Sequence, residues 1–264
     1  MRSRPNRPRN PDRSLDGSRQ PPMQLLLTND DGVHAEGLAC LQRSMTAFGD
    51  VVILAPSEPY SNCGHQITIH RPLTVERLAE GRYALDGSPA DCARLGLVHL
   101  QPDTDWLVSG INAGGNLGID LYMSGTVAAA REAALLGFRA IAFSQYRRRG
   151  RHIDWDWAGR MAARVFRHVL SLPLPPAHFW NVNLPDPGQS AEQPEIIRCD
   201  PDGHPLAVAY ELDVGKYHYR GVYQARKHHP DSDVAHCFTG KISLSQVACG
   251  ILASNSSDPE STSR

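Results

Sequence analysis

Long apolar runs are missing from this 264-residue sequence, since no stretch approaches the ~20 apolar residues that a bilayer-spanning helix needs. The basic N-terminal segment lacks the apolar core of a secretory signal. The six cysteines form no CxxC pair and show no Cys/His ligand spacing, which excludes the usual zinc and dithiol motifs. We therefore predict a cytoplasmic protein with reduced thiols and no membrane partner.

An excess of either charge is also missing, because 27 Lys and Arg stand against 28 Asp and Glu. Residues 1–22 hold six arginines and two aspartates, a net of +4, and the whole chain carries −1, so the other 242 residues sum to −5. A mildly acidic body predicts no stable nucleic-acid partner. A basic arm that touches RNA is the alternative for residues 1–22.

The order of the apolar segments predicts an α/β fold. Strand-like runs at 24–28, 51–55, 106–111 and 139–144 alternate with helical patterns at 36–48, 89–100, 126–136 and 155–170. This alternation is typical of a doubly wound, Rossmann-like and mostly parallel sheet with helices on its faces. After a further strand at 181–184 we expect strands and turns without helices, at 196–199, 206–214 and 242–247.

Four segments follow from these patterns. Residues 1–22, rich in Arg and Pro, are predicted to be a disordered basic extension, and the Ser-rich residues 254–264 a flexible tail. Residues 23–190 are predicted to form the α/β domain, and residues 191–253 a β-rich extension.

Oxygen-bearing side chains follow three of the predicted strands. Asp30 and Asp31 come directly after the first strand, Ser61 lies in the loop after the second, and Asn112 ends the strand at 106–111. In an open α/β sheet, ligands bind beyond the carboxyl ends of the strands. Two carboxylates, a hydroxyl and an amide make an all-oxygen site for one hard cation, Mg²⁺, Mn²⁺ or Ca²⁺. The alternative is that the Asn-Asp-Asp-Gly segment is only a turn.

Two neighbouring segments are suited to an anion. A glycine-rich loop with Gly114 and Gly115 follows the strand at 106–111, and Ser124, Gly125 and Thr126 open the helix after it. Exposed backbone N–H groups in such a loop, and those at a helix N-terminus, bind phosphate. A plain helix cap is the alternative for Ser124 and Thr126. Beside a cation, these groups predict metal-assisted hydrolysis of a phosphomonoester.

At these same residues the chain resembles the SurE family of stationary-phase survival proteins. The similarity extends from residue 23 to about residue 247 and lies in the ordered motifs LLLTNDDGVHAEGL, SNCGHQITIHRPL, DGSPADC, VSGINAGGNLG, SGTVAAAREAALLG and DSDVAHCFTGKISLSQV. The resemblance implies a Rossmann-like domain with a C-terminal β extension used in dimer or tetramer assembly. It also implies 5'-nucleotidase activity with a divalent metal, whose ligands fall on Asp30, Asp31, Ser61 and Asn112.

The chain departs from the family pattern at two places. Residues 57–60, Ser-Glu-Pro-Tyr, stand where the family often has an Asp-Arg-Asn-Arg type sequence, and Tyr-His-Tyr at 217–219 stands where a Tyr-Trp pair is common. These departures concern phosphate contacts, substrate preference and assembly.

We therefore predict hydrolysis of nucleoside 5'-monophosphates by a water bound to one divalent cation per subunit, with Asp30 and Asp31 as catalytic residues and metal ligands. Ser61 and Asn112 complete the metal site. The predicted phosphate-binding residues are Asn62, Gly114, Gly115, Ser124, Gly125 and Thr126.

Several alternatives stay open at this point. One alternative mechanism proceeds through an aspartyl-phosphate intermediate on Asp30 instead of direct attack of water on phosphorus. The overall reaction would still be that of a phosphatase. A broader phosphomonoesterase (3'-nucleotidase or exopolyphosphatase), a non-catalytic nucleotide- or RNA-binding module and a nicotinamide oxidoreductase are the rival functions. The absence of a G-x-G-x-x-G fingerprint after the first strand argues against the oxidoreductase. For His34 and His65 a surface or structural role is expected, and Arg94, Arg131 and Glu132 are expected on solvated helix faces.

Overall fold

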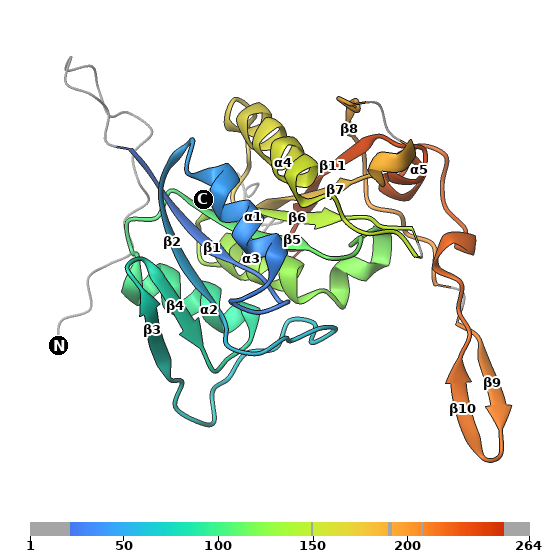
Figure 1. Cartoon of the computed structure of the whole chain (residues 1–264), viewed down its shortest axis with the longest axis horizontal. Helices are drawn as coiled ribbons and strands as arrows, with labels where there is room; N and C mark the ends of the chain where they lie inside the picture. Colours follow the sequence, from blue (N-terminus) through green and yellow to red (C-terminus); the bar gives the residue numbers. More distant parts are fainter. Residues whose placement is uncertain (1–21, 149, 190–191, 207, 251–264) are drawn as a thin grey trace, which may run out of the picture.

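The computed structural model describes residues 22–148, 150–189, 192–206 and 208–250. Nearly all of the predicted N-terminal extension, and the whole predicted tail at 254–264, lie outside these residues. Most of the strands belong to one nine-stranded sheet, whose spatial order is β3-β4-β2-β1-β5-β6-β7-β11-β8 (Figure 1). The predicted α/β fold with a mostly parallel sheet is confirmed, because only the β3–β4 and β7–β11 pairs of this sheet are antiparallel.

The strands of this sheet have the following bounds: β1 Met23–Thr28, β2 Gly49–Pro56, β3 Val75–Ala79, β4 Arg82–Leu85, β5 Trp106–Asn112, β6 Arg139–Gln145, β7 His178–Leu184, β8 Ile196–Arg198 and β11 Ile242–Ala248. The helices are α1 Glu36–Met45, α2 Pro89–Leu95 with a π-helical continuation at Gly96–Leu100, α3 Gly125–Leu135, α4 Trp155–Leu170 and α5 Asp233–Phe238. A separate hairpin joins β9 Tyr210–Asp213 to β10 Lys216–Tyr219.

Helices cover both faces of the sheet, as the alternation of side chains along the strands requires. Leu25 and Leu27 of β1 belong to the core cluster that includes residues of α1 and α4. Leu26, between them, points to the opposite cluster, which includes residues of α2 and α3. Strands that are apolar on both faces are typical of parallel sheets buried between two helical layers.

Local sequence signals explain where the helices begin. At α2, Ser88 accepts from the backbone N–H of Asp91 and the Asp91 carboxylate accepts from the backbone N–H of Ser88, which is a capping box with Pro89 at the first helical position. Asp154 caps α4 through Trp157 N–H, and Arg167 lies in the last turn of that helix. The prediction of a helix at 155–170 is confirmed at both ends.

The C-terminal part differs from the sequence-based expectation. Residues 233–238 form the short helix α5 where only strands and turns were predicted, because Ser232 caps it and Val234 and Cys237 bury its apolar side. The nine-stranded sheet also continues beyond residue 190, since β11 pairs with β7 and β8 pairs with β11. The β9–β10 hairpin projects from the body (Figure 1).

The strand order places the functional edge of the sheet. From β1 the chain passes through α1 to β2 on one side, and it later returns through α2 to β5 on the other side of β1. Such a reversal of strand order opens a crevice at the carboxyl ends of the central strands, which is where ligands bind in doubly wound sheets. Asp30 and Asp31 follow β1, and Asn112 is the last residue of β5.

Candidate active site

Asp30 is a buried carboxylate at this edge of the sheet, directly after β1. Only 5% of its surface is exposed, and Thr126 Oγ1 in the first turn of α3 donates a hydrogen bond to Asp30 Oδ1. The pKa of Asp30 is raised to about 6, mainly by burial and in smaller part by the Asp31 charge, while the Thr126 hydrogen bond lowers it. Because burial disfavours the charged form of Asp30, a neighbouring cation would strongly stabilise that charged form.

Asp31 and Asn112 lie on adjacent strand ends and are joined through one short backbone segment. Asp31 Oδ2 accepts from the backbone N–H of Ala113 at 3.2 Å, and partial burial raises the pKa of Asp31. Asn112 Nδ2 donates to the carbonyl of Gly114 at 2.9 Å, which leaves its Oδ1 for a cation. The pairing of β1 with β5 therefore brings the predicted carboxylate and amide ligands together.

The loop after β2 passes over Asp30. The backbone N–H of Tyr60 donates to the Asp30 carbonyl at 2.7 Å, and the neighbouring Ser61 is exposed at the start of a turn. Asn62 has a left-handed backbone with a φ of 57°. The N–H of Gly64 then donates to the carbonyl of Met123 at 3.0 Å, which ties the loop to the segment before α3.

The donor set fits a hard cation. Within the described parts of the chain, no cluster of three or more His, Cys, Asp or Glu side chains is suited to a metal, so a site here needs neutral oxygens beside its two carboxylates. The candidates for these neutral oxygens are Ser61, which follows β2, and Asn112, the last residue of β5. Mg²⁺, Mn²⁺ and Ca²⁺ accept mixed carboxylate, amide and hydroxyl oxygens, whereas Zn²⁺ prefers His and Cys.

The N-terminus of α3 packs against Asp30. A Cβ at Gly125 would lie 2.8 Å from Asp30 Cβ and 2.9 Å from Cys63 Sγ, so only glycine permits this approach. Ser124 Oγ accepts from the N–H of Val127 and caps the helix. The Ser124 hydroxyl is used to cap α3, and the Thr126 hydroxyl is used to bond Asp30. Phosphate binding by residues 124–126 therefore stays a prediction that concerns only their backbone N–H groups.

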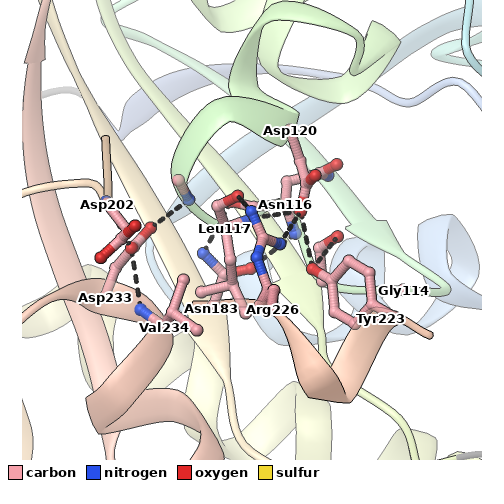
Figure 2. A network of polar contacts seen from close by, with 12 residues as sticks. Gly114, Asn116, Leu117, Asp120, Asn183, Asp202, Tyr223, Arg226, Asp233 and Val234 are labelled. Atoms are coloured by element: carbon pink, nitrogen blue, oxygen red, sulfur yellow. Dashed lines mark hydrogen bonds and ion pairs between the residues drawn. The ribbon is translucent and has the colours of Figure 1, made fainter. Parts of the chain in front are cut away.

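A network of buried polar groups contacts the glycine loop, which comprises residues 113–118 (Figure 2). The N–H of Asn116 donates to Asn183 Oδ1 at 2.7 Å, and Gly118 N–H donates to Asp233 Oδ2 at 2.8 Å. Arg226 donates to Asp120 Oδ2 at 2.7 Å and to the carbonyl of Leu117 at 3.1 Å. The predicted anion-binding loop is thus held by Asn183, 67 positions away in sequence, and by Arg226 and Asp233, each more than 100 positions away.

Glu132 corrects one sequence-based interpretation. It was expected on a solvated helix face, but its side chain is buried, with only 3% exposed. Its carboxylate accepts a hydrogen bond from Arg94 Nε at 2.7 Å and lies 2.9 Å from His65 Nε2. Burial alone would raise its pKa, but the hydrogen bonds and charges of these two partners hold the pKa of Glu132 below its usual value. The signal in the sequence was a lone carboxylate within the alanine-rich, buried helix α3. His65 thereby has a structural partner, and His34 is exposed.

Residues 25–200 match the family model described as Survival protein SurE, and this segment contains every candidate site residue from Asp30 to Thr126. The chain belongs to the SurE family. Relatives extend the match over the body of the chain. A protein of Synechocystis sp. is 48% identical over 225 residues, which are 85% of this chain and 99% of that protein. The "5'-nucleotidase SurE" of Pelobacter propionicus is 44% identical over 67% of this chain and 72% of its own length.

A solved structure supports the SurE fold. The structure titled "Crystal Structure of Sure Protein from Aquifex aeolicus" superposes with a TM-score of 0.76 at 29% identity, and the match covers 87% of this chain and 95% of that one. This confirms the predicted SurE-like architecture. In the described residues, no helix is both long and apolar enough to cross a membrane.

Proposed function

We propose that this SurE protein is a metal-dependent 5'-nucleotidase that hydrolyses nucleoside 5'-monophosphates to a nucleoside and phosphate. The observation that best supports it is the pair Asp30 and Asp31 at the reversal point of the sheet, where burial raises both pKa values and the candidate amide ligand Asn112 bonds to the glycine loop. The name of the Pelobacter relative as a 5'-nucleotidase agrees with this activity.

In the proposed reaction, different residues bind the cation, orient a carboxylate and bind the phosphoryl group. Asp30, Asp31, Ser61 and Asn112 would hold one divalent cation per subunit, either Mg²⁺ or Mn²⁺, with Ca²⁺ as a further candidate. When bound, such a cation polarises a phosphoryl oxygen and lowers the pKa of a bound water. Thr126 keeps the Asp30 carboxylate oriented through its hydroxyl. Backbone N–H groups at Asn62, Gly114, Gly115 and the first turn of α3 would stabilise charge on the phosphoryl oxygens.

Phosphate release from a substrate panel tests this proposal. With Mg²⁺ or Mn²⁺, the wild type should release phosphate from nucleoside 5'-monophosphates faster than from 3'-monophosphates or short polyphosphate. Faster release from the latter two would indicate a broader phosphomonoesterase. Tight nucleotide binding without release under any metal would indicate a non-catalytic nucleotide-binding module.

Cation binding should depend on pH because the cation competes with a proton on Asp30. Below its pKa of about 6 the group is protonated, so we expect cation affinity to rise about tenfold per pH unit between pH 4.5 and 6 and to level off above pH 7. Without a cation, the raised pKa means that the folded state binds the proton more tightly, so stability should fall as the pH rises from about 4 through about 6. Calorimetric titration with Mn²⁺ and thermal unfolding across this range measure both effects. An affinity independent of pH would contradict the assignment of Asp30 as a ligand.

The β9–β10 hairpin is the proposed assembly element, joining subunits into a homodimer or homotetramer. Its apolar side chains are exposed in the single chain: Leu212 by 60%, Val214 by 93% and Tyr217 by 71%. Exposed apolar side chains gathered on a projecting element mark a subunit interface. The free thiols of all six cysteines agree with the proposed location of this assembly in the cytoplasm.

Charged substitutions on the hairpin should therefore dissociate the assembly. We expect Leu212→Asp combined with Tyr217→Asp to reduce the molar mass, measured by light scattering, to that of one subunit. Asp213→Ala, an exposed change on the same strand, is the control and should leave the mass unchanged. An unaltered oligomer in the double variant would show that another surface joins the subunits.

A further inference from the structure

Glu132 is a buried carboxylate of α3 that the proposed reaction does not use. Its two oxygens contact different elements: Oε1 accepts from Arg94 of α2 at 2.7 Å, and Oε2 lies 2.9 Å from Nε2 of His65 in the loop after β2. We propose that Glu132, acting through His65, is a positioning residue that holds residues 61–62 of this loop at the candidate metal site. This inference rests on the proposed function.

Residues 61–62, a candidate metal ligand and a candidate phosphate-binding residue, lie in a short span between two fixed points. Before the span, the backbone N–H of Tyr60 donates to the Asp30 carbonyl at 2.7 Å. After it, the side chain of His65 contacts the buried carboxylate of Glu132. Because so few residues separate these two points, the place of the second point limits where the Ser61 hydroxyl and the Asn62 N–H can lie.

The contact at His65 differs from the next side-chain contact along the loop. Thr68 bonds Asp91 through both its N–H and its hydroxyl, which fixes the later part of the loop to α2. His65 instead contacts α3, the helix whose Thr126 donates to the carboxylate of Asp30. The loop with Ser61 and the buried carboxylate of the candidate metal site are therefore both tied to one rigid helix.

The two partners of Glu132 have separable roles. Burial raises the pKa of Glu132, but the hydrogen bonds and charges of His65 and Arg94 hold the pKa below its usual value, so the group is a carboxylate at neutral pH. A charged acceptor forms stronger hydrogen bonds than a neutral one. The bond from Arg94 joins α2 to α3 and stabilises their packing, whereas the contact with His65 fixes the loop.

The test compares His65→Ala with Arg94→Ala in the full chain. These side chains are 24% and 44% exposed, so both positions tolerate truncation. We expect His65→Ala to weaken Mn²⁺ binding about tenfold in calorimetric titration, the loss typical when a group that orients a metal ligand is removed. Arg94→Ala should lower Tm but change Mn²⁺ affinity less than about twofold. His65→Gln, whose amide N–H can still donate to Glu132, should restore most of the affinity.

Hydrogen exchange reports on the loop without any metal. The N–H of Gly64 donates to the Met123 carbonyl at 3.0 Å, so this amide is protected in the wild type. We expect its exchange to become at least about tenfold faster in His65→Ala and to stay at the wild-type rate in Arg94→Ala.

Two results would overturn the positioning role. One is wild-type Mn²⁺ affinity in His65→Ala, and the other is an equal loss of affinity in His65→Ala and Arg94→Ala, which would make Glu132 a purely structural residue. If the wild type binds no Mn²⁺, the proposed metal site fails by itself, and the exchange of Gly64 then decides whether Glu132 fixes the loop. Faster exchange in His65→Ala alone would support the contact, and unchanged exchange would refute it.

Discussion

Asp31→Asn and Asp30→Asn should each reduce metal-dependent phosphate release at least 10³-fold, the order of loss expected when a group that holds the electrophilic centre is removed. Asparagine keeps the shape of each side chain, and at position 30 its oxygen still accepts from Thr126. The loss would therefore come from the missing charge rather than from misfolding. Steady-state kinetics at saturating Mn²⁺ measures this.

Asp50→Asn is the matched control for these two substitutions. Asp50 lies near the opposite end of β2, where it accepts from Gln24 Nε2 at 2.8 Å on an exposed surface. We expect this variant to keep wild-type activity. If Asp31→Asn retained more than about a tenth of the wild-type rate, the carboxylate would contribute less than about 1.4 kcal/mol to the barrier, too little for a metal ligand.

Arg226→Met should lower the free energy of unfolding by about 3–5 kcal/mol, because it leaves the charge of Asp120 without its partner in a buried site. The Arg226 side chain is 2% exposed, and its guanidinium donates to Asp120 Oδ2 at 2.7 Å. It also holds the Leu117 carbonyl and lies 5.0 Å from the Tyr223 ring centroid. Denaturant unfolding of the metal-free protein measures the loss.

A double-mutant cycle separates the ion pair from packing. Asp120→Asn combined with Arg226→Met removes both charges, so we expect it to recover most of the stability that Arg226→Met loses. If the two single losses simply add, the pair is not coupled and the network drawn in Figure 2 does not stabilise the glycine loop through this contact.

Much of the fold was predictable because its central elements have strong periodic patterns. The helix at 155–170 and the strand at 24–28 were found in place because their apolar residues face a core. Strands β3 and β4 were not predicted, since β3 is mostly exposed and has no alternating apolar face. Helix α5 has only six residues, too few to show a helical period.

In the candidate site, too, the features that short sequence patterns encode were predictable, and the contacts between residues far apart in sequence were not. Strand ends identify Asp30, Asp31 and Asn112, because parallel topology brings such ends to one edge. The hydrogen bond from Thr126 to Asp30 and the tie from Arg226 to Leu117 join residues 96 and 109 positions apart. No local pattern encodes contacts of that separation, so Tyr223 and Arg226 were not predicted as supports of the glycine loop.

Phosphate release from one nucleoside 5'-monophosphate, followed before and after chelation and after return of Mn²⁺, tests the central claim most directly. The proposal predicts that release stops when the cation is chelated and resumes when Mn²⁺ is restored, in the wild type and in Asp50→Asn but in neither Asp30→Asn nor Asp31→Asn. Release that continues at full rate under chelation, or that survives loss of both carboxylates, would contradict a metal-dependent nucleotidase centred on Asp30 and Asp31.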